Sequence, residues 1–229
     1  MKENLILPNR TEFVWGRRYL LFQLVFLGTF LSLGASLIGI RLTPMALNLS
    51  YFTINFIVVV ILCRKYLLQT MGYGLHNLRR CLLWAVLGFI GYQMLATLVS
   101  ILIMVLRPDF SNINDQNLAL IGKENYSLLV IGTVLLVPLT EEVFYRGIVF
   151  GSFYRRSRPA AYAVSTVVFA LVHISGYIGH ADVLTLLLCF LQYIPAGVCL
   201  ALAYEYSGSL LAPILIHTTV NAIGTMAMR

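Results

Sequence analysis

The amino-acid sequence predicts an all-α protein, a polytopic transmembrane bundle of about seven helices (six to eight) with its N-terminus inside. Composition is the first reason. Of the 229 residues, 59% are hydrophobic and only 11% are charged, whereas soluble domains carry about 25% charged residues. The mean hydropathy is +0.85. The second reason is that the apolar residues form long runs, and about 20 of them in a helix cross a bilayer.

Seven apolar runs follow one another along the chain. They cover about residues 19–40, 43–62, 82–106, 127–150, 159–175, 183–203 and 209–226. The first run is longer than the core of a signal peptide and lacks a small-residue cleavage site, so we expect a retained helix. The fifth run is the shortest, at about 17 residues.

We expect a single membrane domain over residues 1–229. Its N-terminal part, residues 1–125, holds the first three helices and an outer loop, and residues 126–226 form the catalytic core. The longest polar stretch, about residues 107–125, is too short to fold around a core of its own. We find no internal repeat and no interdomain linker.

The basic residues divide unevenly between the two sides of the predicted bundle. Eleven lie at the inner ends of the runs: Lys2, Arg10, Arg17, Arg18, Arg64, Lys65, Arg79, Arg80, Arg155, Arg156 and Arg158. Four lie at the outer ends: Arg41, Arg107, Lys123 and Arg229. This asymmetry favours an inside N-terminus and an outside C-terminus. It also explains the net charge of +7 without a nucleic-acid partner, because the clusters flank apolar runs.

Cysteine, glycine and proline positions point to packing rather than to chemistry. Cys63, Cys81, Cys189 and Cys199 lie in or beside apolar runs without CxxC spacing, so we expect free thiols. We expect close helix approach at Gly147, Gly151, Gly197 and Gly224. Pro138 removes a helix hydrogen bond. It either bends the fourth helix and admits water or is a kink that neighbouring groups tolerate.

The fourth run contains three ionisable residues, Glu141, Glu142 and Arg146. Each costs about 2.5–3.5 kcal/mol on insertion scales, which makes a functional site the default hypothesis. Glu142 and Arg146 are separated by four residues and share one helical face, so we predict an ion pair. Glu141 points about 100° away and is left free to take a proton from water. The alternative is that both glutamates only join an interhelical ion-pair network.

Two further runs carry histidine. His173 follows Phe169 by four residues and His217 precedes Asn221 by four, so each pair occupies one helical face. On the predicted topology Glu141 and both histidines lie about 12–21 Å from the inner boundary and can share a site. A single intramembrane histidine often serves only as an interhelical hydrogen-bonding group. The first three runs carry no ionisable group, so we expect the chemistry in the C-terminal half.

These residues form three motifs, which are Glu141-Glu142-xxx-Arg146, Phe169-xxx-His173 and His217-xxx-Asn221. In this order, on three apolar runs, the set resembles the CPBP family of intramembrane proteases. This family is also called the CAAX protease and bacteriocin-processing (Abi) family. The resemblance covers about residues 125–226, and the first three runs add only hydropathy to it.

The resemblance implies a helical fold with a polar cavity inside the membrane. In that cavity Glu141 would activate water, His173 would hold or polarise it, and His217 and Asn221 would stabilise the oxyanion of the tetrahedral intermediate. Oxyanion donors contribute about 3–4 kcal/mol each. Glu142 and Arg146 would support the site.

A metal is the open alternative for this site. Glu141, His173 and His217 match the His₂Glu ligand set of a catalytic zinc. The chain has no HExxH sequence, however, and Asn221 is a poor zinc ligand but a good oxyanion donor. Glu142 is already assigned to Arg146. We therefore predict glutamate-activated water without an obligatory metal.

The sequence thus predicts an intramembrane endopeptidase of the cell membrane. Its expected partners are the lipid bilayer and a membrane-associated, prenylated or otherwise hydrophobic peptide or protein, because members of the family that it resembles include processors of prenylated CAAX proteins. The oligomeric state is left open. One alternative is a non-catalytic bacteriocin-immunity or peptide-binding membrane protein. The other is a proton-coupled transporter, which also needs buried Glu, His and Arg but usually shows repeats with interrupted helices.

Overall fold

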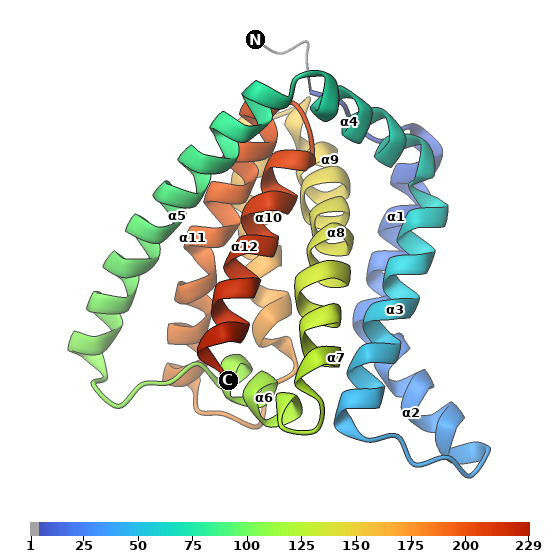
Figure 1. Cartoon of the computed structure of the whole chain (residues 1–229), viewed down its shortest axis with the longest axis vertical. Coiled ribbons are helices and arrows are strands. Elements are labelled where there is room, and N and C mark those ends of the chain that lie inside the picture. Colours follow the sequence, from blue (N-terminus) through green and yellow to red (C-terminus); the bar gives the residue numbers. More distant parts are fainter. Residues whose placement is uncertain (1–4) are drawn as a thin grey trace.

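The computed structural model describes residues 5–229, and these residues form helices and connecting loops without any strand (Figure 1). Six helices are long and apolar enough to cross a membrane: Arg10–Leu37, Pro44–Leu62, Leu78–Leu106, Tyr126–Tyr154, Arg158–Ser175 and Val183–Ser207. A shorter apolar helix, Leu211–Ala227, follows them. The predicted fold class, a multi-pass helical bundle, is confirmed. The inside location of the N-terminus stays a prediction.

Several spans consist of consecutive helical segments. The elements that form the spans are α1 (Arg10–Phe22), η1 (Gln23–Leu27), α2 (Gly28–Leu37), α3 (Pro44–Leu62), α5 (Leu78–Leu106), α7 (Tyr126–Val130), η2 (Ile131–Leu136), α8 (Val137–Glu142), η3 (Val143–Phe150), α9 (Gly151–Tyr154), α10 (Arg158–Ser175), α11 (Val183–Ser207) and α12 (Leu211–Ala227). The η segments are π-helical stretches. Such stretches are rare and often lie at functional sites.

Local sequence explains where several helices begin and end. Asn9 and Glu12 form a reciprocal capping box at the start of α1, which satisfies two free N–H groups. Thr43 immediately precedes α3, and its side chain caps the helix by accepting from the N–H of Ala46. Pro44 occupies the first turn. Because the capping box precedes the apolar run, the first span begins at residue 10 and not at residue 19 as predicted.

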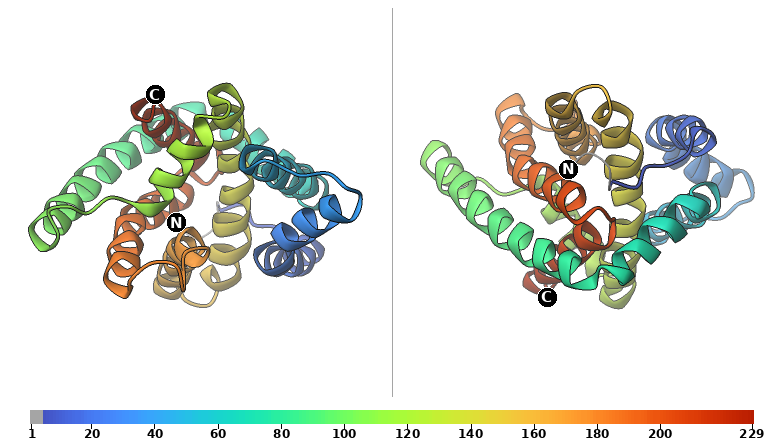
Figure 2. Two further views of the ribbon diagram at one scale, coloured as in Figure 1. Left: turned by 90° about the horizontal axis from the view of Figure 1, so that it is seen from below. Right: turned by 90° about the horizontal axis from the view of Figure 1, so that it is seen from above.

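Two helices lie in segments that connect the predicted apolar runs. They are α4 (Arg64–His76) and α6 (Ile113–Gly122), which cross opposite ends of the bundle (Figures 1 and 2). The side chain of Thr70, on α4, accepts a hydrogen bond from the backbone N–H of Leu210 at 3.0 Å. Both helices are too short and too mixed in polarity to be detected by a search for apolar segments of about 20 residues. Packing against the bundle stabilises such helices more than local propensity does.

The described spans surround one central span. The segment from α7 to α9 stands between the α1–α3 group on one side and α10–α12 on the other, and α5 slants across α11 and α12 (Figures 1 and 2). Tyr66 on α4 and Tyr204 on α11 are fully buried, and their hydroxyl groups are 2.8 Å apart. This contact holds the end of the bundle that carries α4.

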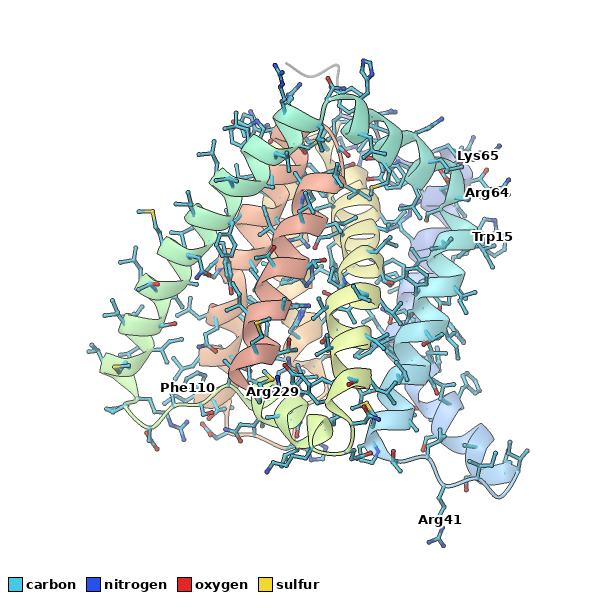
Figure 3. All side chains as sticks on the ribbon, viewed as in Figure 1. Trp15, Arg41, Arg64, Lys65, Phe110 and Arg229 are labelled. Carbon is cyan, nitrogen blue, oxygen red and sulfur yellow. The ribbon has the colours of Figure 1, made fainter. Side chains whose placement is uncertain are left out.

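The basic clusters occupy opposite ends of the molecule, as the sequence indicated. Arg64 and Lys65 lie at the end that carries α4, whereas Arg41 and Arg229 lie at the other end (Figure 3). Lys2, which the sequence assigns to the first group, lies outside the described residues. The four cysteines are buried and free, as predicted.

The glycine predictions are confirmed at three positions and wrong at one. A Cβ atom on Gly147 would lie 2.7 Å from the Tyr66 ring, one on Gly197 would lie 2.6 Å from Thr166, and one on Gly151 would lie 3.1 Å from two side chains. At Gly224 nothing lies within 4 Å of such an atom. Gly224 on α12 therefore permits no close helix approach.

Candidate active site

A cavity of about 920 Å³ lies among the spans and receives residues from both halves of the chain. Four predicted site residues line it: Glu141, His173, His217 and Asn221. Glu142 and Arg146 are fully buried and do not belong to the lining. The structure thus brings the six predicted residues together in two layers, one at the cavity and one behind it.

The buried layer is an ion pair within one helical turn. The guanidinium of Arg146 lies 3.2 Å from each oxygen of the Glu142 carboxylate, through Nη1 and Nε. Its Nη2 donates to the backbone carbonyls of Ala196 and Gly197 on α11, at 3.3 Å each. The guanidinium carbon also lies 4.8 Å from the ring centroid of Phe169 on α10. Arg146 therefore ties the α8–η3 span to two neighbouring helices.

Glu142 also contacts the cavity layer. Its Oε1 lies 2.8 Å from Nδ1 of His217 on α12, and both side chains are buried. A carboxylate can only accept, so Nδ1 of His217 carries the proton and Nε2 faces outward. Spacing along the chain contains no signal for this contact, because the two residues lie on different helices.

Glu141 faces both histidines. Its Oε2 lies 3.8 Å from Nε2 of His173 and 3.8 Å from Nε2 of His217. These separations are too long for direct hydrogen bonds, and one water molecule at about 2.8 Å from each atom would bridge them, although Oε2 itself is buried. The Glu141 side chain keeps 20% of its exposure, and no protein group within residues 5–229 donates to Oε2.

His173 is held in place by three groups. Its Nδ1 lies 2.8 Å from the backbone carbonyl of Phe169, which again directs the ring proton to Nδ1 and leaves Nε2 for the cavity. Its ring centroid lies 4.4 Å from that of Phe169 and 4.3 Å from that of Tyr193 on α11. Sequence reasoning missed Tyr193, which lies in an apolar run without a distinguishing pattern.

Asn221 has a partner that the sequence did not indicate. Its Nδ2 donates to the backbone carbonyl of Thr133 at 2.8 Å. In the π-helical stretch η2 the N–H of Val137 donates to the carbonyl of Gly132, five residues back. The next carbonyl, that of Thr133, would pair with residue 138, but Pro138 has no N–H. Asn221 therefore satisfies the carbonyl that Pro138 leaves free, while its second amide hydrogen remains available.

Two sets of polar side chains enlarge the site beyond the predicted residues. From the first two spans, Gln23, Tyr51 and Asn55 line the cavity, although these spans were predicted to add only hydropathy. Asp115 lines it from α6, where desolvation raises the pKa of the carboxyl. The remaining histidines, His76 and His180, are exposed.

The fit of a metal can be judged from ligand spacing. Ligands of a tetrahedral zinc, at about 2.0–2.1 Å from the ion, lie about 3.4 Å from one another. The distances of 3.8 Å between Glu141 Oε2 and the two Nε2 atoms exceed this value. Within the described residues no three His, Cys, Asp or Glu side chains gather closely enough to hold a metal. The spacing suits a water molecule better than a zinc ion.

Comparison with known proteins agrees with this geometry. Residues 123–223 match the family model described as type II CAAX prenyl endopeptidase Rce1-like. The predicted resemblance to the CPBP family is confirmed. The CPBP match contains all six predicted site residues and leaves the first three spans outside.

Two curated proteins are similar to this chain. The membrane-embedded CAAX protease MroQ of Staphylococcus aureus (strain USA300) is 27% identical over 148 residues, which are 60% of this chain and 54% of the relative. The UPF0177 protein YxdF of Lactococcus lactis subsp. lactis (strain IL1403) is 27% identical over 95 residues, 42% of this chain and 47% of the relative. The chain thus spans about half the length of these relatives. No solved structure matches it.

Proposed function

We propose that the protein is an intramembrane endopeptidase in which Glu141 activates water. The supporting observation is the position of Glu141 Oε2, 3.8 Å from Nε2 of both His173 and His217, inside a cavity of a multi-pass membrane protein. The CPBP match supports protease activity. The Phe169 carbonyl holds the ring proton of neutral His173 on Nδ1, which makes its Nε2 an acceptor.

The first step follows from these hydrogen-bonding roles. Water donates one hydrogen to Glu141 Oε2 and the other to Nε2 of His173, so that its lone pair faces the scissile carbonyl carbon. Glu141 takes the proton as the C–O bond forms, and the carbonyl electrons move to oxygen. Collapse of this intermediate breaks the C–N bond, and Glu141 returns its proton to the leaving amine.

His217 stabilises the intermediate in its protonated form. A proton on Nε2 turns this atom into a donor for the oxyanion, and the Glu142 carboxylate balances the imidazolium from the other side. Before the attack, the charges of Glu141, Glu142, Arg146 and protonated His217 sum to zero. The sum stays zero when Glu141 takes the water proton and the oxyanion forms, which reduces the cost of burying these groups. The free amide hydrogen of Asn221 is a second donor for the same oxygen.

The substrate is a membrane-associated peptide or protein, prenylated or otherwise hydrophobic. The cavity lies among membrane spans, so its substrate must enter from the bilayer or from its surface. The family description names a CAAX prenyl endopeptidase and one relative is named a membrane-embedded CAAX protease, which supports a prenylated substrate. Cleavage next to a prenylated cysteine is one version of this chemistry.

Comparative peptidomics tests the function and the base together. Membranes containing the wild type are compared with membranes containing Glu141→Gln, with Glu124→Gln as the control. Glu124 is an exposed carboxylate that accepts from the N–H of Met45 at 3.3 Å and does not line the cavity. We expect new peptide termini with the wild type and the control and none with Glu141→Gln. A folded Glu141→Gln variant that cleaves at the wild-type rate contradicts the assigned base.

A further inference from the structure

Three polar side chains of the N-terminal spans reach the cavity. Gln23 begins the π-helical stretch η1, and Tyr51 and Asn55 lie one turn apart on α3. Gln23 is 6% exposed and Asn55 is 3% exposed, so both are removed from water. Polar groups within membrane spans are costly, and each one requires an explanation.

The contact between the first two residues is explained by helix packing. The Tyr51 hydroxyl donates to Oε1 of Gln23 and thereby joins α3 to the first span. Polar side chains often link membrane helices in this way. This pair therefore needs no ligand.

Asn55 is different because the oxygen of its side-chain amide has no hydrogen-bond partner among the described residues. Its Nδ2 donates to the backbone carbonyl of Tyr51 at 3.0 Å, but Oδ1 is buried and has no hydrogen-bond partner within residues 5–229. A buried acceptor without a partner destabilises the fold. A leucine at this position would avoid that cost, so the unused oxygen points to a partner that is present during function.

A peptide substrate supplies such a partner. A peptide bond must be in an extended segment to reach Glu141, and an extended segment inside the membrane has unpaired N–H groups, each of which needs an acceptor. The wall formed by α3 is held close to the catalytic span, since α3 packs against α8 and η2. A Cβ atom on Gly132 of η2 would lie 2.8 Å from the Phe52 ring of α3.

We propose that Oδ1 of Asn55 accepts a hydrogen bond from a backbone N–H of the substrate, so that α3 forms a peptide-binding wall of the site. This inference rests on the proposed function, and it extends the site to a span outside the CPBP match. It makes Asn55 a substrate-binding residue that leaves the chemistry at Glu141 unchanged.

The test removes substrate N–H groups one at a time. The probe is an internally quenched, farnesylated peptide ending in a CAAX sequence, together with versions that carry a single backbone N-methyl group. Each is assayed with the wild type, Asn55→Ala and Thr53→Ala. Thr53 lies on the same helix and does not line the cavity.

We expect one N-methyl position to raise KM of the wild type by about three- to tenfold, the value of one hydrogen bond. Asn55→Ala should raise KM for the unmodified peptide similarly, keep kcat, and lose its sensitivity at that single position. Thr53→Ala should behave as the wild type does. Asn55→Ala with an unchanged N-methyl profile overturns the inference and leaves the proposed function intact. Absence of cleavage of this probe by the wild type, together with the absence of new peptide termini in the peptidomics comparison, contradicts the proposed function itself.

Discussion

Glu142 Oε1 lies 2.8 Å from Nδ1 of His217, and the same carboxylate contacts the guanidinium of Arg146 at 3.2 Å. Glu142 therefore has two partners, and both contact its Oε1. Toward Arg146 it neutralises a buried cation, and toward His217 it fixes the ring and its tautomer. A carboxylate in this position favours the protonated form of the histidine when negative charge develops on the substrate. The two adjacent glutamates thus have separate tasks, one with water and one with His217.

Glu142→Gln tests the second task. The amide keeps the shape and can still accept from Nδ1 of His217, but it removes the charge that balances an imidazolium. We expect kcat to fall by about 10²-fold or more with little change in KM. The measurement is steady-state cleavage on the folded fraction, with Glu124→Gln as the control. An unchanged kcat would mean that Glu142 contributes only to folding.

Arg146→Gln tests how much the ion pair with Glu142 stabilises the fold. The change leaves the buried Glu142 without its cation, and breaking such a pair costs about 3–5 kcal/mol. Thermal unfolding in detergent should therefore show a large drop in Tm. Combining it with Glu142→Gln should recover part of the loss, because no uncompensated charge remains. Arg107→Gln is the control, since its partner Asp182 is exposed and a pair of this kind adds little stability.

Chelation tests the prediction of a metal-independent reaction. Glu141 Oε2 lies 3.8 Å from the Nε2 atom of each histidine, which is wide for shared zinc ligands. Purified protein treated with a strong chelator and then freed of it should keep its cleavage rate. If the chelator abolishes cleavage and added zinc restores it, Glu141 does not activate water without a metal.

A double-mutant cycle tests why Asn221 lies beside Pro138. Asn221→Ala leaves the Thr133 carbonyl without a donor, so we expect a loss of about 1–3 kcal/mol in stability. Pro138→Ala restores a backbone N–H for that carbonyl. Asn221→Ala should therefore cost less stability in the Pro138→Ala background, with a coupling of about 1 kcal/mol. Equal losses in both backgrounds, together with a lower kcat, would leave Asn221 with only the oxyanion role.

The sequence predicted the spans better than their connections, for a physical reason. A bilayer requires about 20 apolar residues in a helix, and that requirement is visible in any one run. Helices α4 and α6 are stabilised by contacts with distant residues, such as that between Thr70 and Leu210, which no local window contains. The first span starts early because capping by Asn9 and Glu12 extends it beyond the apolar residues.

The candidate site also contains contacts that the sequence predicts and contacts that it does not. The Glu142–Arg146 pair follows from spacing, because both residues lie on one helix and the helical repeat sets their distance. The contact between Glu142 and His217 depends on how two helices are rotated and packed, which spacing does not encode. The same holds for Asn55, a single polar residue in an apolar run. The catalytic roles of the six predicted residues stay predictions.

Gly197→Ala tests the packing that positions Arg146. The new Cβ would lie 2.6 Å from a side-chain atom of Thr166 and 2.9 Å from its Cα, so α10 and α11 must move apart. The Gly197 carbonyl also accepts from Arg146, which would shift with α11. We expect a stability loss of about 1–3 kcal/mol and a lower kcat. Gly224→Ala, where nothing lies within 4 Å, should be neutral or stabilising by up to about 1 kcal/mol through helix propensity. Equal effects at the two glycines would contradict the close approach of α10 and α11.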